Sequence, residues 1–206
     1  MQMTRTKIRI NHKGSAIADS RPKGGNAQQP LQDNQYRKEL ETYIQSQWDI
    51  KQPDWFITIQ WTPAPYTFEQ ASHHAKHFRN IFLSSIYSCS LKKLPRPEDR
   101  CRLIWFHERA QDPKGRLIYH SHLHLIDHPE TNLTALDIHW IIDTTVAPGF
   151  QCLKHLHRKI DPAVVIKPWN RSHHGNYNLK DYYTYKYHQD ADLVLDYERS
   201  DLITTK

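Results

Sequence analysis

One stretch of the sequence, Arg116-Leu-Ile-Tyr-His-Ser-His-Leu-His-Leu-Ile-Asp127, decides the fold. In a β-strand successive side chains point to opposite faces, so His120, His122 and His124 share one face and the residues between them share the other. Residues 102–109 have the composition of a second strand, and the turn-forming segment Gln-Asp-Pro-Lys-Gly lies between the two. The sequence therefore predicts a β-hairpin with a row of histidines on one face.

The other predicted helices and strands lie before and after this hairpin in the sequence. Apolar residues at helical spacing predict helices over residues 36–48, 68–86 and 133–140, the last with Thr134 and Asp137 as its cap. Runs of β-branched and aromatic residues predict strands at 55–61 and 164–166, and Asn178 caps a final helix. This order predicts an α+β fold, an antiparallel sheet with helices packed on it.

Composition limits the class of protein. The chain has 206 residues and a formal charge of +6, of which +4 belongs to residues 1–34. We predict a flexible basic leader at 1–34 and one folded domain at 35–206. The sequence has no membrane-length apolar run, and its three cysteines form no CxxC pair, so we expect a cytoplasmic location and no membrane partner. The absence of GxGxxG and GxxxxGK[ST] motifs argues against a nucleotide-driven motor.

The histidine row is a candidate metal site. Neighbouring imidazoles on one strand face lie about 7 Å apart and can converge on one divalent ion. We favour His122 and His124, because Leu123 between them can enter the core. The third ligand must come from across the hairpin: an even loop places His107 opposite His120, and an odd loop places Glu108 there. We favour Glu108, because Mg²⁺ and Mn²⁺ prefer carboxylate; His107 and His120 stay alternatives, as do solvated histidines without any ion.

A second candidate site lies near the C-terminus. In Tyr183-Thr-Tyr-Lys186, the lysine stands one helical turn beyond Tyr183. A phenol of pKa about 10 needs a nearby cation to act as a nucleophile at neutral pH. Tyr182 falls at a hydrophobic-staple position relative to Asn178, which leaves Tyr183 as the candidate nucleophile and Lys186 as its partner.

Three motifs occur in the order typical of the HUH endonucleases, and the chain resembles the single-tyrosine rolling-circle replication initiators (Rep proteins) of that superfamily. The motifs are the strand at 56–61, the His-hydrophobic-His motif at 122–124 and the YxxK motif at 183–186. The resemblance covers most of the chain and implies an antiparallel sheet of about five strands flanked by helices. At the position where two-tyrosine members repeat the lysine this chain has Asp190, which favours a single nucleophile.

The resemblance also implies an activity. Tyr183 would cut single-stranded or hairpin origin DNA, form a 5′-phosphotyrosine, release a 3′-OH primer and later rejoin the strand. His122, His124 and Glu108 would hold Mg²⁺ or Mn²⁺, and Lys186 would stabilise charge near Tyr183. Because the chain carries no helicase motif, a separate helicase and the host replication machinery would be partners, as for a plasmid replication protein.

Three other functions fit parts of the sequence. His120-Ser-His-Leu-His124 approximates the motif of the histidine-triad nucleotide hydrolases, although Ser121 stands where that motif has an apolar residue. An HUH transposase would use the same residues on a mobile element. A non-catalytic DNA-binding module would use the basic leader for phosphate contacts and exposed aromatic residues for base stacking.

Overall fold

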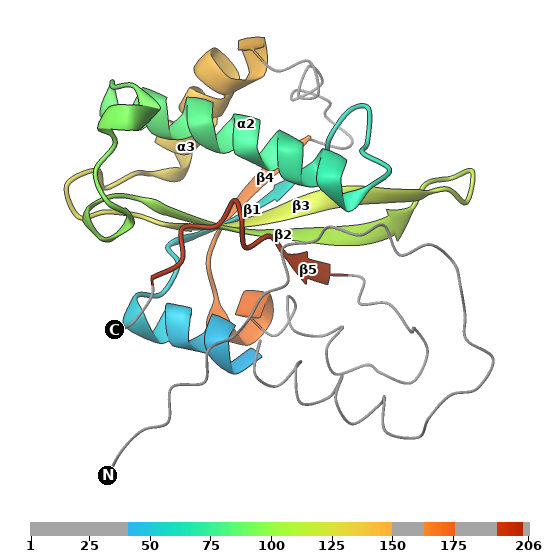
Figure 1. Ribbon diagram of the computed structural model, residues 1–206, viewed down its shortest axis with the longest axis horizontal. Coiled ribbons are helices and arrows are strands. Elements are labelled where there is room, and N and C mark those ends of the chain that lie inside the picture. Colours follow the sequence, from blue (N-terminus) through green and yellow to red (C-terminus); the bar gives the residue numbers. More distant parts are fainter. Residues whose placement is uncertain (1–40, 150–162, 176–192, 204–206) are drawn as a thin grey trace. The chain divides into compact units, whose positions relative to one another are not determined.

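The computed structural model describes residues 41–149, 163–175 and 193–203. The chain divides into two compact units, Met1–Tyr36 and Arg37–Lys206, and every described residue belongs to the second. This second unit is built on an antiparallel sheet with helices packed against it (Figure 1), which confirms the predicted α+β class.

The sheet has the strand order β4-β1-β3-β2-β5, and every neighbouring pair is antiparallel. Its strands are β1 (Trp55–Ile59), β2 (Arg102–Gln111), β3 (Leu117–Ile126), β4 (Val164–Pro168) and β5 (Leu193–Leu195). The predicted hairpin is confirmed as β2 and β3, and the predicted strands near residues 55 and 164 are β1 and β4. The short β5 was not predicted; it pairs with residues 106–108 of β2.

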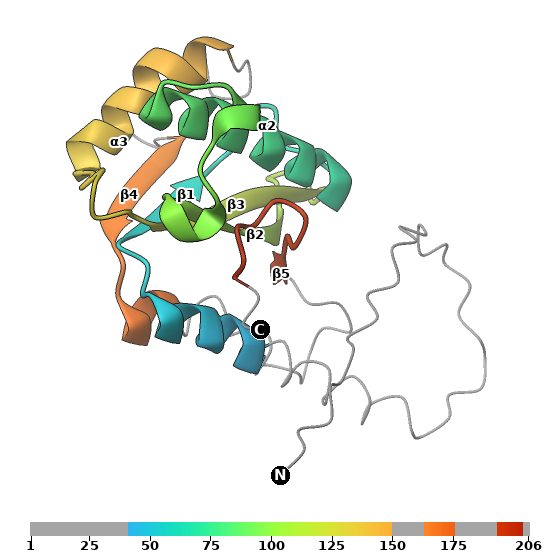
Figure 2. The same ribbon diagram turned by 60° about the vertical axis from the view of Figure 1, so that its left-hand side comes forward.

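Helices α2 (Phe68–Tyr87) and α3 (Ala135–Ile141) lie on the same face of the sheet (Figures 1 and 2). The first begins where the Thr67 side chain accepts a hydrogen bond from the backbone N–H of Gln70, and it ends at Ser88 in the left-handed region, at φ 47°. Both helices were predicted. None of the helices in the described ranges is both long enough and apolar enough to cross a membrane.

The predicted capping box of α3 is confirmed. The Thr134 side chain accepts from the N–H of Asp137, and the Asp137 carboxylate accepts from the N–H of Thr134. The chain then continues through a π-turn, Ile142–Val146, and a 3₁₀ turn, Ala147–Gly149. The loop predicted between α2 and β2 contains two further 3₁₀ turns, Leu91–Lys93 and Pro97–Asp99.

The residues that α3 buries are not the ones that its apolar spacing predicts. Leu136 and Trp140, which mark the predicted helix, are 79% and 65% exposed. Ile138 and Ile141 are buried instead and join the core beneath α2. Spacing at i and i+4 therefore identified the helix, but it did not identify the face that packs on the sheet.

Separate hydrophobic clusters cover the two faces of the sheet. The larger joins α2 and α3 to one face, with Phe78, Phe82, Leu103, Trp105 and Leu123 among its members. The smaller joins helical residues 41–50 to the other face through Ile44, Trp48, Ile104, Phe106, Ile126 and Leu195. The turn Arg171–Gly175 follows β4 and carries the buried His174. The histidine row lies on this second face, beside the smaller cluster.

Candidate metal centre

The register of the β2–β3 hairpin places Glu108 directly opposite His120. Five residues, 112–116, connect the two strands, so the odd loop that predicts this pairing is confirmed. The Asp112 carboxylate closes the loop by accepting from Arg116 Nε at 2.8 Å and from the Lys114 N–H at 2.9 Å. Gly115 has φ 74°, a conformation that favours glycine over residues with a Cβ. The length and conformation of this turn therefore determine that Glu108, and not His107, lies opposite His120.

Three side chains converge on this face of the sheet. Glu108 Oε2 lies 2.8 Å from His120 Nε2 and 2.8 Å from His122 Nε2. One ligand atom from each of the three residues lies within 4.8 Å of the other two. Glu108 and His122 are buried, whereas the side chain of His120 is 24% exposed. The group is therefore held firmly by the sheet and is open to solvent on the His120 side.

The electrostatics of the group favour an ionised carboxylate. Burial alone would raise the pKa of Glu108, but hydrogen bonds and charge from His120 and His122 outweigh burial and hold this pKa well below its ordinary value. The second nitrogen of His122, Nδ1, lies 3.3 Å from Thr58 Oγ1 on β1, and the His122 ring stacks on Phe56 with centroids 5.2 Å apart. Contacts of this kind orient a histidine that binds metal through its other nitrogen.

The donor set fits a divalent metal ion. Two imidazole nitrogens and one carboxylate oxygen form a common ligand combination for transition metals such as Mn²⁺ or Zn²⁺. With metal–ligand bonds of about 2.1 Å, neighbouring ligand atoms would lie about 3.0–3.4 Å apart, close to the 2.8 Å observed here. Shifts of a few tenths of an ångström would therefore admit an ion. The three residues do not by themselves select one metal.

Of the predicted pair His122 and His124, the structure brings only His122 into this group. Its histidine partner there is His120, and His124 stands two residues further along β3, opposite Ile104. The His124 ring is fully buried against Trp48 and Phe106, at centroid distances of 5.5 and 4.9 Å. Burial lowers the pKa of His124 well below its ordinary value, which favours the neutral ring.

The reverse face of β3 does not distinguish the two pairs as the sequence argument assumed. The pair flanking Leu123 was favoured because Leu123 can enter the core. Ser121 is also fully buried: its Oγ lies 2.7 Å from Trp61 Nε1 and 2.8 Å from His107 Nδ1. His107 Nε2 in turn lies 3.0 Å from Asp196 Oδ2. His107 therefore faces away from the histidine row, and this polar network anchors the strand behind it.

Substitution of the two candidate histidines, one at a time, gives a direct prediction. His120→Ala is expected to weaken Mn²⁺ binding by more than about 10-fold, because it removes one of three ligands and the loss of a residue that only orients a ligand already costs 10- to 100-fold. His124→Leu, which keeps a buried side chain of similar size, is expected to leave Mn²⁺ affinity unchanged. Titration of free Mn²⁺ by electron paramagnetic resonance measures both, with His73→Ala on the exposed face of α2 as the matched control. Equal losses in His120→Ala and His124→Leu would contradict this assignment.

Another histidine near the group was not predicted to matter. His174 stacks on Phe56 with centroids 4.3 Å apart and planes at 7°, and its Nδ1 accepts from the Asn170 N–H at 2.9 Å. Phe56 therefore contacts both His122 and His174. No periodic pattern marks His174 in the sequence, because it lies in a short turn after β4. The remaining predicted site residues, Tyr183 and Lys186, lie outside the described residues.

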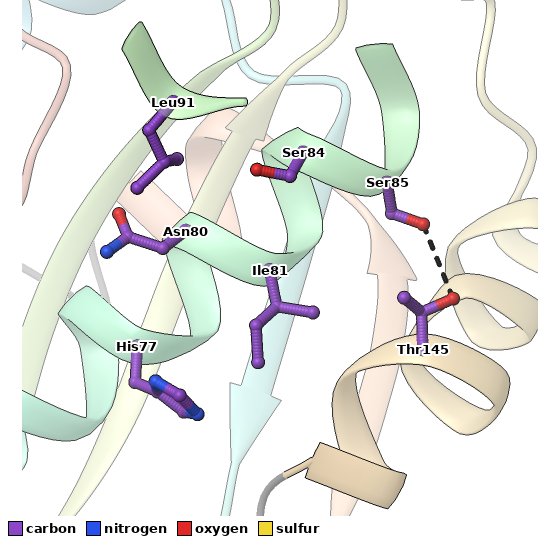
Figure 3. A pocket seen from close by; sticks show the side chains of 7 residues that line it. All are labelled: His77, Asn80, Ile81, Ser84, Ser85, Leu91 and Thr145. Atoms are coloured by element: carbon purple, nitrogen blue, oxygen red, sulfur yellow. Dashed lines mark hydrogen bonds between the residues drawn. The ribbon is translucent and has the colours of Figure 1, made fainter. Parts of the chain in front are cut away.

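A hollow along α2 is not part of this group (Figure 3). It has a volume of about 460 Å³, and its lining includes His77, Ile81 and Leu91. Ser85 Oγ on α2 donates to Thr145 Oγ1 across one side of it, at 3.3 Å. Because α2 packs on the face of the sheet opposite to Glu108, the hollow and the candidate metal centre lie on different sides of the sheet.

Comparisons of the chain with protein-family models, with curated proteins and with solved structures each found no match.

Proposed function

We propose that this protein is a metal-dependent endonuclease that nicks and rejoins single-stranded DNA through a tyrosine, with the fold and activity of an HUH rolling-circle replication initiator. The observation that carries the proposal is the group of Glu108, His120 and His122, whose ligand atoms converge on one face of an antiparallel sheet. The motif at 183–186, which follows in the order expected for the superfamily, supports it from the sequence.

The proposed reaction is a transesterification at a phosphodiester bond of the DNA. A divalent ion held by Glu108, His120 and His122 would polarise the scissile phosphate. The Tyr183 oxygen attacks phosphorus, the phenolic proton is lost, and the bond from phosphorus to the 3′ oxygen breaks, giving a 5′-phosphotyrosine and a free 3′-OH. Attack by a later 3′-OH reverses the transfer, restores the phosphodiester bond and releases Tyr183. Lys186 lowers the cost of the phenolate and of the charge on the phosphate.

The open side of the group offers a route for DNA. His120 is the most exposed of the three residues, and it lies on the part of β3 that leads to the hairpin loop. Near the start of β3, the guanidinium of Arg116 lies 5.3 Å from the centre of the Tyr66 ring, and both side chains are about half exposed. An exposed aromatic ring beside a cation is suited to base stacking and phosphate contact. These residues support single-stranded DNA as the substrate.

The proposal predicts a covalent adduct that depends on one tyrosine. Incubation with labelled origin DNA and Mn²⁺ is expected to give a protein–DNA adduct on a denaturing gel. Tyr183→Phe is expected to reduce its yield by at least about 10³-fold, because the attacking oxygen is removed. Tyr182→Phe is the matched control and is expected to retain the adduct.

Two further outcomes separate this proposal from its alternatives. A chelator is expected to abolish the adduct, whereas a histidine-triad hydrolase would cleave a nucleotide phosphoramidate without any metal. Retarded migration of DNA on a native gel, with no adduct under any metal, would instead identify a DNA-binding module. A separate helicase is expected to be required before a double-stranded plasmid can be replicated with the purified protein.

A further inference from the structure

Arg102, the first residue of β2, is a buried cation without a hydrogen-bond partner for its Nη1 atom within the described part of the chain. Only 3% of the residue is exposed. It pairs with Ile126 at the end of β3, about 20 Å along β2 from Glu108, as six residues of strand span. A charged group buried without a partner is costly, because it loses its hydration and gains no compensating hydrogen bond.

Arg102 lines a pocket of about 270 Å³, which we call the Arg102 pocket. Its polar and charged lining residues are Lys51, Glu98, Arg100, Arg102, Asp127 and His128. The other lining residues are apolar and come from the end of the helical residues 41–50, from β3, from the loop after it and from the C-terminal segment. The pocket is large enough for a small charged group and below the usual range for a drug-sized ligand.

The other charges of the pocket are mostly engaged. Arg100 forms a two-pronged pair with Asp201, at 2.6 and 3.0 Å. The Asp127 carboxylate accepts hydrogen bonds from Cys101 Sγ, from Thr131 Oγ1 and from backbone N–H groups of its own loop. Lys51 donates to the backbone carbonyl of Asp127. Among the described lining residues, the carboxylate left near Arg102 is that of Glu98, which is exposed to solvent.

One donor of the pocket, Arg102 Nη1, therefore has no hydrogen-bond partner within the described part of the chain. An arginine guanidinium presents its N–H groups in a planar fork that matches the oxygen spacing of an oxyanion. Lys51 and His128 stand on the same lining and can add donors to a tetrahedral anion. Burial lowers the pKa of Arg102, and Asp201 and Glu98 oppose that effect, so an anion in contact would further stabilise the charged form.

We propose that the Arg102 pocket binds a phosphate group. The group comes either from the backbone of a nucleic acid or from a free phosphate or mononucleotide. It is not the phosphate that the Glu108 group would act on, because six residues of β2, about 20 Å of strand, separate Arg102 from Glu108. The proposal is independent of the endonuclease activity.

The test measures the thermal unfolding of the full-length wild type and of full-length Arg102→Met. Each protein is measured in the presence of three ligands, one at a time, at constant ionic strength. The ligands are inorganic phosphate, a deoxynucleoside monophosphate and a short single-stranded oligonucleotide, with chloride as the reference. In wild type, a ligand at ten times its Kd is expected to raise Tm by about 3 °C. Arg102→Met is expected to lose this shift completely, whereas Lys76→Met, which removes an exposed cation on α2, is expected to keep it.

The substitution itself is expected to leave the protein folded. Methionine fills much of the arginine volume and removes a buried cation whose Nη1 atom has no hydrogen-bond partner within the described residues, so Arg102→Met in chloride is expected to lose little stability. Glu98→Gln, which removes the neighbouring carboxylate, is expected to tighten phosphate binding several-fold.

The three ligands distinguish the source of the phosphate. A shift with inorganic phosphate or mononucleotide identifies a free small molecule, and a shift with the oligonucleotide alone identifies a nucleic-acid backbone. The absence of a shift with all three ligands, or equal shifts in wild type and Arg102→Met, would overturn the proposal.

Discussion

Glu108→Gln is expected to reduce the affinity for Mn²⁺ by at least about 100-fold, since changes to residues that merely orient a ligand already cost 10- to 100-fold. The substitution removes the negative charge that draws the ion but keeps the size of the side chain. Its amide oxygen can still accept from His120 and His122, which lie 2.8 Å from the carboxylate in the wild type. The fold is therefore expected to survive while the metal affinity is lost.

Calorimetric titration with Mn²⁺ measures this effect, and circular dichroism verifies the fold of each variant. Glu130→Gln is the matched control: it makes the same chemical change at an exposed position in the loop after β3 and is expected to bind Mn²⁺ as wild type does. A Glu108→Gln protein with unchanged affinity would show that the carboxylate is not a ligand and that the three residues form only a hydrogen-bonded cluster.

Asp201→Ala is expected to lower the free energy of unfolding by about 3–5 kcal/mol, the usual cost of removing one partner from a buried ion pair. Asp201 is 4% exposed and accepts from Arg79 Nη2 at 2.5 Å, from two nitrogens of Arg100 and from the Leu103 N–H. Without the Asp201 carboxylate, the buried Arg100 guanidinium loses the acidic partner with which it pairs. A loss of this size is a large fraction of the stability of a typical domain.

Urea denaturation followed by circular dichroism measures the change. Asp99→Ala, at an exposed position in the turn before β2, is expected to alter stability by less than about 0.5 kcal/mol. The free energy of unfolding lost in Asp201→Asn is expected to lie between the losses in Asp201→Ala and Asp99→Ala, because the amide keeps the shape and part of the hydrogen bonding of the carboxylate. A loss below about 1 kcal/mol in Asp201→Ala would mean that solvent reaches Arg100 once the carboxylate is gone.

Local patterns in the sequence predicted most of the elements and the central hairpin. Alternation, a short-range property of a strand, identified β3, and the capping box of Thr134 was predictable as another local pattern. Loop parity left His107 and Glu108 both open as the residue opposite His120, and Glu108 was favoured because Mg²⁺ and Mn²⁺ prefer carboxylate. The five-residue loop of the structure places Glu108 there.

Choices between equivalent positions were not predictable. His120 and His124 lie on the same face at the same spacing from His122, so strand periodicity cannot separate them. The position of Glu108 along the partner strand separates them. Leu136 and Ile138 both lie on α3, and only the packing of that helix on the sheet determines which is buried.

Long-range contacts between polar residues carried no sequence signal. Asp201 is 101 residues from Arg100, and Asp196 is 89 residues from His107, so neither pairing follows from a local pattern. The orientation of Arg102 toward a pocket depends in the same way on segments that meet only in the folded chain.

The polar network of Ser121, His107 and Asp196 on the reverse face of β3 has a consequence for the order of events at the proposed site. It immobilises the strand that carries His120 and His122, so the ligand atoms are in place before any ion or DNA arrives. Little conformational entropy would then be lost when an ion enters. On the proposed function, the ion would bind at a site that is already formed in the absence of DNA.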